Sequence, residues 1–317
     1  MHGISGGVEV KRGYGFFIIG LLCIVLCIGT SVLAEERAKP NIRQSILAGS
    51  WYPGNTEKLR DAIETYLERA DAPAPAGELK ALIVPHAGYV YSGQVAAYAY
   101  GLLRHSGFKR VVMIGPSHRV RFRGASVSMQ DGYKTPLGIV PVDHGFARKL
   151  LKGNDTMQWE PRAHAREHSL EIQIPFLQTV LSDFRIVPIL MGEQNYETCR
   201  SVATILARAI GSSEGTLILA STDLSHFHSY RQARALDAAF IKHVADFDPS
   251  GLAQSLASGK CEACGGGPAM TVLLAARRQG ANRSTILRYA NSGDVTGDHS
   301  RVVGYLSAAL SRVKAED

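Results

Sequence analysis

Hydrophobic positions along the chain first repeat at a helical spacing and later gather into short runs. Between residues 56 and 70, apolar side chains recur every three or four residues at Leu59, Ile63, Tyr66 and Leu67. This spacing places them on one face of a helix. The preceding residues 53–55 (PGN) are typical of a turn that ends in a helix cap. The pattern predicts an amphipathic scaffold helix over residues 56–70.

Four later apolar runs have the length and β-branched content of buried strands. They cover residues 79–84, 110–114, 184–190 and 216–220. Helix-like stretches lie between or beside them, at residues 92–103, 146–151, 169–181 and 199–209. This alternation predicts an α/β fold with a largely parallel central sheet and helices on both faces.

Two further strands are expected near the carboxyl terminus, at residues 286–290 and 302–306, the second of which would close the sheet. Asn291 and Asp294 follow the first of them and fit turn formers better than ligands. We therefore expect one domain over residues 40–312.

Polar residues follow directly after several of the expected strands. His86, His118, Asp223 and His226 all occupy such positions. Ligands bind beyond the carboxyl ends of the strands in open α/β sheets, so these side chains should converge. Imidazole is the commonest neutral metal ligand, and Asp223 could orient an imidazole. The alternative is that each histidine only caps its own loop.

An uncharged apolar run near the amino terminus is typical of a targeting segment. Residues 1–34 fit a signal peptide cleaved after the small residue Ala34, or an uncleaved anchor that spans a membrane with residues 15–34. In either form, Lys11 and Arg12 stay on the cytoplasmic side. The folded body is then expected to be extracytoplasmic, either periplasmic or secreted, or anchored to the membrane.

Charge and composition give no sign of a nucleic-acid partner. The chain has 35 Lys and Arg against 28 Asp and Glu, a formal net charge of +7, but the basic residues occur in short pairs. Nucleic-acid-binding proteins concentrate such residues in a patch or stripe. The expected partner is an unknown small molecule or peptide, with membrane contact only through an uncleaved N-terminal segment.

Three cysteines follow the apolar leader. Cys199 fits a small apolar helix residue. Cys264 precedes a glycine-rich turn, and Pro268 suits the first turn of a helix that ends near Arg278. A thiol at that place should have a lowered pKa, which favours a thiolate ligand or nucleophile. Alternatively, Cys261 and Cys264 form a Cys-x-x-Cys pair that could close a disulfide in an oxidising compartment.

A competing motif lies at residues 164–168, where HAREH matches the His-x-x-Glu-His pattern of one metallopeptidase class. The nearby proline and the Ala-Arg content place His164 in a loop that enters a helix, so a metallohydrolase is only a minor alternative. We expect Glu167 and His168 to line the pocket as acid, base or ligand-orienting groups. Glu171 could form a capping box after His168.

Several ordered motifs resemble the Memo family. They are AGSWYP at residues 48–53, PHAGY at 85–89, GPSH at 115–118, EHSLE at 167–171 and DLSH at 223–226. The match runs in order from about residue 43 to 310, so it is far more specific than one short pattern. In bacteria and archaea, this family includes the protein B component of the AmmeMemoRadiSam system.

The resemblance implies a fold similar to the LigB-type class III extradiol dioxygenases and a metal site of two histidines and one cysteine. By motif, these ligands would be His86, His118 and Cys264, the last placed by CGGGP at residues 264–268. Copper or iron binding, a redox role and a eukaryotic signalling scaffold are associated with the family. Its members are expected in the cytoplasm, so the apolar leader is a departure.

Two functions from different classes fit these residues. In the first, His86, His118 and Cys264 hold iron or copper, with zinc also possible, in a dioxygenase-like oxidoreductase. Its catalytic groups would be His226, Asp223, His168 and Glu167, and its pocket walls Trp51, Tyr89 and Tyr91. In the second, the same pocket holds a peptide or partner without turnover, because fold alone does not establish chemistry.

Overall fold

The structure is a computed structural model, and it describes residues 6–13, 39–71, 75–212 and 214–314. The chain divides into an N-terminal segment, Met1–Lys39, and a folded unit, Pro40–Asp317. Most of the expected leader lies outside the described residues, so its nature and the location of the folded body stay predictions. Within the described ranges, no helix is long and apolar enough to cross a membrane.

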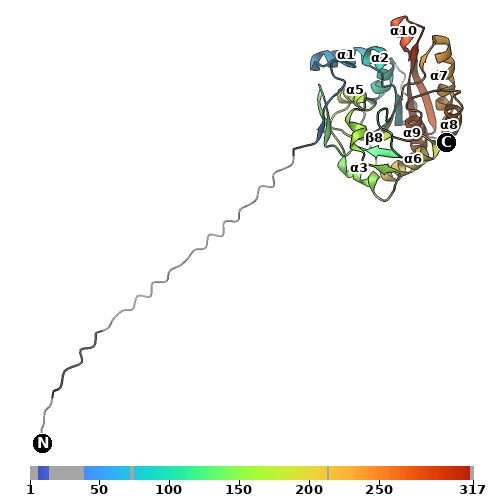
Figure 1. The fold of residues 1–317 in the computed structure, drawn as a ribbon. Helices are drawn as coiled ribbons and strands as arrows, with labels where there is room; N and C mark the ends of the chain where they lie inside the picture. Colours follow the sequence, from blue (N-terminus) through green and yellow to red (C-terminus); the bar gives the residue numbers. More distant parts are fainter. Residues whose placement is uncertain (1–5, 14–38, 72–74, 213, 315–317) are drawn as a thin grey trace. The chain divides into compact units, whose positions relative to one another are not determined.

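A nine-stranded mixed sheet forms the centre of the folded unit (Figure 1). Its strands are β2 (Glu78–Val84), β3 (Arg110–Pro116), β4 (Ala125–Val127), β7 (Met157–Gln158), β8 (Arg185–Met191), β9 (Thr216–Ser221), β10 (His226–His228), β11 (Arg283–Asn291) and β12 (Val302–Arg312). The middle four are parallel and run in the order β2, β9, β3, β8. On one side, β12 pairs antiparallel with β2, β10 and β11; on the other, β4 pairs antiparallel with β8 and carries β7.

A second, three-stranded sheet lies in the N-terminal part of the folded unit. It consists of β1 (Ile42–Arg43), β5 (Gly132–Thr135) and β6 (Gly138–Pro141). The pairing of β1 with β5 is parallel and that of β5 with β6 is antiparallel. This sheet brings Arg43 and Tyr133 close to the short helical segment that contains His164.

Helices cover both faces of the large sheet. Successive strand residues point to opposite faces, so a strand of consecutive apolar residues presents apolar side chains on each face. In β2, Ala81 and Ile83 join one hydrophobic core, while Leu82 and Val84 join the other. The first core includes α3 (His144–Leu151), α6 (Tyr196–Ile210), α7 (Tyr230–Ala245), α8 (Pro249–Ala257) and α9 (Gly266–Arg278). The second includes α1 (Thr56–Glu68), α2 (Tyr89–Tyr100) and α5 (Ile174–Val180), on the opposite side of the sheet in Figure 1. Shorter helical segments are Gly101–Leu103, α4 (Pro161–Ala165), Glu171–Gln173 and α10 (Ser292–Thr296).

This architecture confirms the predicted α/β class with a parallel central sheet and helices on both faces. The helix predicted from residue 56 is α1, and the Asn55 side chain caps it by accepting the N–H of Lys58. Asn291 and Asp294 form a capping box at α10, which agrees with their assignment as turn formers. Strands β4 to β7 have only two to four residues each, too few to show a hydrophobic period, and the sequence pattern missed them.

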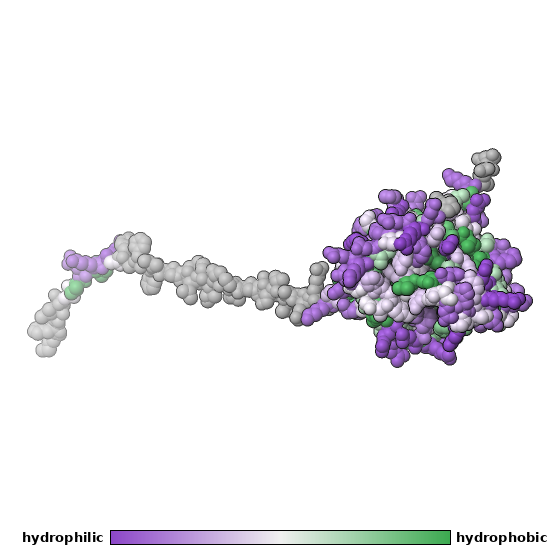
Figure 2. Space-filling view, turned by 90° about the horizontal axis from the view of Figure 1, so that it is seen from above, coloured by the Kyte–Doolittle hydropathy of each residue, from purple (hydrophilic) through white to green (hydrophobic). Residues whose placement is uncertain are grey.

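One face of the folded unit is seen in the space-filling view. Figure 2 shows hydrophilic residues over most of its visible face, with small separate hydrophobic patches between them. Large hydrophobic side chains that are exposed on this unit include Trp51, Val90, Tyr91 and Phe227.

Candidate metal centre

Polar segments meet at the carboxyl edge of the parallel strands. His86 follows β2, Asp223 and His226 follow β9, and His118 follows β3. Because β2, β9 and β3 are adjacent and parallel, their carboxyl ends share one edge of the sheet. The loop between α4 and the helical turn at 171–173 adds His168.

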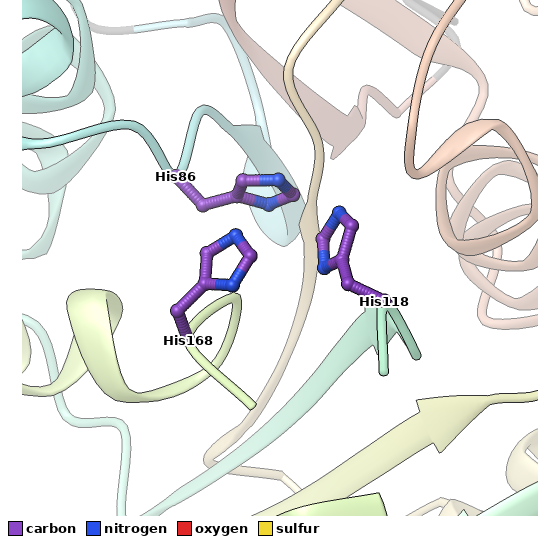
Figure 3. A group of neighbouring side chains, drawn as sticks. All are labelled: His86, His118 and His168. Atoms are coloured by element: carbon purple, nitrogen blue, oxygen red, sulfur yellow. The ribbon is translucent and has the colours of Figure 1, made fainter. Parts of the chain in front are cut away.

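Three imidazoles form the centre of this group. One possible ligand atom from each of His86, His118 and His168 lies within 4.8 Å of the other two. Figure 3 shows these rings coming from three segments and surrounding a common space. The His86 ring is nearly perpendicular to the other two, at 89° and 87°. His118 and His168 are stacked at 4.4 Å with an interplanar angle of 24°. The three imidazoles could hold a metal ion.

Glu167 fixes the ring and the backbone of His118. Its Oε1 lies 2.9 Å from Nδ1 of His118, and its Oε2 accepts the main-chain N–H of His118 at 2.7 Å. Burial alone would raise the Glu167 pKa, but the hydrogen bond and the charge of His118 lower that pKa to about 2. An ionised carboxylate only accepts hydrogen bonds, so Nδ1 of His118 donates; in the neutral form of the ring, Nε2 then keeps its lone pair.

His86 is held from several sides at the base of the site. Its Nδ1 lies 2.9 Å from Oγ of Ser221, and its main-chain N–H donates to Oδ1 of Asp223 at 2.7 Å. Burial and the nearby His168 ring lower the pKa of His86 well below its usual value. The ring is therefore neutral at pH 7. Its Nε2 lies 3.0 Å from Sγ of Cys264.

Cys264 contacts His86 but is not one of the three residues whose ligand atoms lie within 4.8 Å of one another. Its Sγ accepts the N–H of Asp223 at 3.3 Å. Burial and the Asp223 carboxylate raise the pKa of the Cys264 thiol. The predicted lowering is therefore wrong for the metal-free thiol, because desolvation outweighs the effect of the helix terminus. Cys199, Cys261 and Cys264 are all free thiols, so the alternative disulfide is not formed here.

Asp223 and His226 lie beside the imidazoles, and Asp223 contacts His86 in a different way from the one predicted. Asp223 was expected to orient an imidazole; instead its Oδ1 bonds the main chain of His86, and Oδ2 is 3.9 Å from Nε2. Burial raises the Asp223 pKa to about 7. His226 donates from Nδ1 to the carbonyl oxygen of Leu224 at 2.7 Å, so its Nε2 keeps a lone pair.

Comparison with known proteins identifies the family. The family description "Memo-like protein" matches residues 43–309. The chain belongs to the Memo family. A MEMO1 family protein of Methanopyrus kandleri is 37% identical over 281 residues, which cover 85% of this chain and 99% of that protein. A MEMO1 family protein of Methanosarcina mazei is 38% identical over 266 residues, covering 83% and 97%.

A solved structure of an uncharacterized protein from Escherichia coli K12 aligns with 74% of this Memo-family chain and with 100% of that chain. The TM-score of this alignment is 0.45 and the sequence identity is 16%.

A buried ion pair supports the loop of this Memo-family chain that holds Glu167 and His168. Arg43 pairs with Glu171 at 2.5 Å, and both side chains are at most 3% exposed. Arg43 also donates to the carbonyl oxygens of His164 and Glu167, each at 2.7 Å. Glu171 accepts from the segment at residues 45–52, including the Tyr52 hydroxyl. The capping-box alternative for Glu171 is therefore wrong, because its carboxylate is saturated by this segment.

The metallopeptidase-like motif of the Memo-family chain does not form a pair of metal ligands. His164 lies on α4, not in the predicted loop, because Glu160 and Pro161 start a short helix there. Its Nδ1 contacts the Tyr133 hydroxyl at 3.1 Å, and its Nε2 contacts Oγ of Ser126 at 3.0 Å. Both ring nitrogens are thus engaged away from His168.

The burial of His164 should make the stability of the folded unit depend on pH. Burial lowers its pKa to about 3 in the folded protein, against about 6.5 when unfolded. Because the unfolded state binds the proton more readily, stability falls as pH drops from about 6.5 towards the folded pKa, by about 2 kcal/mol between pH 7 and 5. Denaturant titrations at pH 7 and pH 5 measure the free energy of unfolding. In His164→Gln, the part of its decrease that comes from His164 should be absent. The exposed His105→Gln should keep it, and equal slopes in all three proteins would refute the assignment.

Asp237 is a supporting residue that the sequence pattern did not reveal. Asp237 is fully buried on α7 and accepts the N–H of Ser225 at 2.9 Å and the hydroxyl of Tyr289 at 2.8 Å. It thereby fixes the loop between Asp223 and β10. A lone acid in an amphipathic helix reads as a surface charge, so only its burial distinguishes it.

The three aromatic residues expected to wall the pocket divide into two groups. Trp51 packs on His168 with ring centroids 4.8 Å apart and remains 37% exposed, and Tyr91 is 44% exposed. Tyr89 is instead a core residue whose hydroxyl donates to the carbonyl oxygen of Ile172. Its place at the start of α2 turns it into the second core.

Proposed function

We propose that this Memo-family protein is a metal-dependent redox protein in which His86, His118 and Cys264 bind iron or copper. The main support is that a hydrogen bond at Nδ1 holds the ring of each of the two histidines. Each Nδ1 is engaged, His86 with Ser221 and His118 with Glu167, at 2.9 Å. Each Nε2 is therefore left as the nitrogen for a metal, the arrangement that ligating histidines adopt.

Cys264 is a better third ligand than His168. The lone pair of an imidazole nitrogen lies in the ring plane, and the planes of His118 and His168 are stacked with only 24° between them. An ion in the plane of one ring therefore lies well off the plane of the other. Sγ of Cys264 is 3.0 Å from Nε2 of His86, within the reach of two ligands that share one ion, given bonds of about 2.0 to 2.3 Å.

Three protein ligands of this type suit iron or copper and leave coordination positions open for a substrate. When bound, the metal supplies electron exchange with that substrate. His168 is placed to accept a proton, because burial lowers its pKa to about 4 and keeps the ring neutral at pH 7. Asp223 can hold or release a proton at its carboxyl oxygens near pH 7.

Two substitutions separate Cys264 from His168 as the third ligand. Cobalt(II) is a redox-stable probe, and a thiolate bound to it gives a charge-transfer absorption. Cys264→Ser should abolish that absorption and weaken cobalt binding by more than about 100-fold, beyond the loss of a residue that only orients a ligand. His168→Gln should keep both. The matched control is Cys261→Ser, which removes the neighbouring thiol. If the absorption survives in Cys264→Ser, the third ligand is misassigned.

A non-catalytic binding role is the second proposal, and exposed apolar side chains favour it. Trp51, Val90 and Tyr91 are 37%, 70% and 44% exposed. Trp51 lies against His168, and Val90 and Tyr91 begin α2, four and five residues after His86. Such groups could hold an apolar segment of a peptide. Protein purified without added ions decides between the proposals, since stoichiometric iron or copper supports the redox role and metal-free protein supports binding alone.

A further inference from the structure

A chain of buried polar side chains leads from α2 to the ring of His86. Tyr100 donates its hydroxyl proton to Oε1 of Gln173 at 2.7 Å. Nε2 of Gln173 donates to the carbonyl oxygen of Pro85 at 3.0 Å and to Oγ of Ser221 at 2.7 Å. Ser221 in turn meets Nδ1 of His86 at 2.9 Å. Tyr100, Gln173 and Ser221 are each at most 1% exposed, so they depend on one another for hydrogen bonds.

Two carbonyl oxygens determine which atom donates and which accepts in each hydrogen bond of this chain. A carbonyl only accepts, so Pro85 requires the NH₂ group of Gln173, which fixes the orientation of the amide. The carbonyl oxygen of Ser169 lies 2.6 Å from Oγ of Ser221, and the proton between these oxygens is that of the Ser221 hydroxyl. A hydroxyl has one proton and two lone pairs. One lone pair accepts from Gln173, and the other is left for His86.

We propose that Gln173 and Ser221 are positioning residues that hold His86 in the tautomer protonated at Nδ1, so that Nε2 keeps its lone pair. The inference rests on the proposed metal site, because Nε2 is the atom assigned to the metal. A neutral imidazole without such a partner divides between two tautomers, and only one of them offers Nε2. Selecting one tautomer and one ring orientation costs free energy. When hydrogen bonds fix both before the metal binds, metal binding no longer includes that cost.

His86 and His118 have different partners at Nδ1, and both partners leave Nε2 of the neutral ring with its lone pair. His118 uses the ionised Glu167, whereas His86 uses a neutral hydroxyl. A carboxylate in place of Ser221 would add a second buried acid beside Asp223, which already bonds the main chain of His86. The neutral chain through Gln173 sets the tautomer without that charge.

The tautomer is readable in the metal-free wild-type protein. Two-bond ¹H–¹⁵N spectra of protein labelled at histidine distinguish a protonated Nδ1 from a protonated Nε2, and His86→Gln assigns the signals of residue 86. We expect His86 to be neutral with the proton on Nδ1. A His86 ring protonated on Nε2 would overturn the proposal. Because no metal is present, this outcome does not depend on whether the proposed metal function is correct.

Variants then link the tautomer to metal binding, with cobalt(II) as the probe. Ser221→Ala should give mixed His86 tautomers and weaken cobalt binding by about 10- to 100-fold. Ser221→Thr keeps a hydroxyl and should restore both properties. Ser169→Ala is the matched control, because it removes a buried hydroxyl bonded to the Pro116 carbonyl but leaves the main-chain acceptor. Unchanged tautomer and affinity in Ser221→Ala would refute the role.

Discussion

Replacing His86 and His118 together with glutamine should abolish iron or copper binding. Each residue supplies one of three assigned ligands through an Nε2 whose lone pair is kept free by the hydrogen bond at Nδ1. With one ligand left, the site cannot compete with water or buffer for the ion, and the metal content of protein purified without added ions should fall from near one per chain to background.

The comparison needs a variant with the same number of histidines removed elsewhere. His105→Gln combined with His144→Gln serves this purpose, because both positions lie outside the three-imidazole cluster. Elemental analysis of the two double variants and the wild type should show metal loss only in the first. Equal metal content in all three would exclude the strand-end histidines as the binding site.

Replacing Arg43 with methionine should destabilise the folded unit by about 3–5 kcal/mol, the cost of leaving one partner of a buried ion pair without its counterion. The Glu171 side chain, 1% exposed, would lose the guanidinium group that now pairs with it. The carbonyl oxygens of His164 and Glu167 would also lose the donors that now reach them at 2.7 Å. Denaturant titration at pH 7 measures this free energy of unfolding.

An exposed ion pair of the same residue types provides the control. Arg104 pairs with Glu64, and their side chains are 42% and 41% exposed. Because solvent screens such pairs, Arg104→Met should change stability by no more than about 1 kcal/mol. A loss in Arg43→Met as small as that would contradict the supporting role assigned to the buried pair.

The sequence predicted the parts of the site that depend on local pattern. His86 and His118 come directly after apolar runs of strand length, and the rule that ligands collect beyond parallel strands brought them together. His168 was placed at the pocket by its motif, although its stacking on His118 at 4.4 Å could not be foreseen. Such a contact depends on how two loops pack.

The supporting residues could not be predicted, because their partners are distant in the chain. Arg43 and Glu171 are separated by 128 positions, and Gln173 and Ser221 by 48. Neither separation leaves a periodic signal. The pKa of Cys264 was mispredicted for a related reason: the sequence shows the helix that follows it, but burial and the charge of Asp223 appear only in the fold.

Anomalous diffraction from crystals of the protein with the metal it carries on purification, recorded at the iron and copper absorption edges, tests the metal centre most directly. We predict one strong peak at one of these edges, bonded to Nε2 of His86, Nε2 of His118 and Sγ of Cys264. A peak bonded to His164, or one that excludes both His86 and His118, would contradict the assignment of the site.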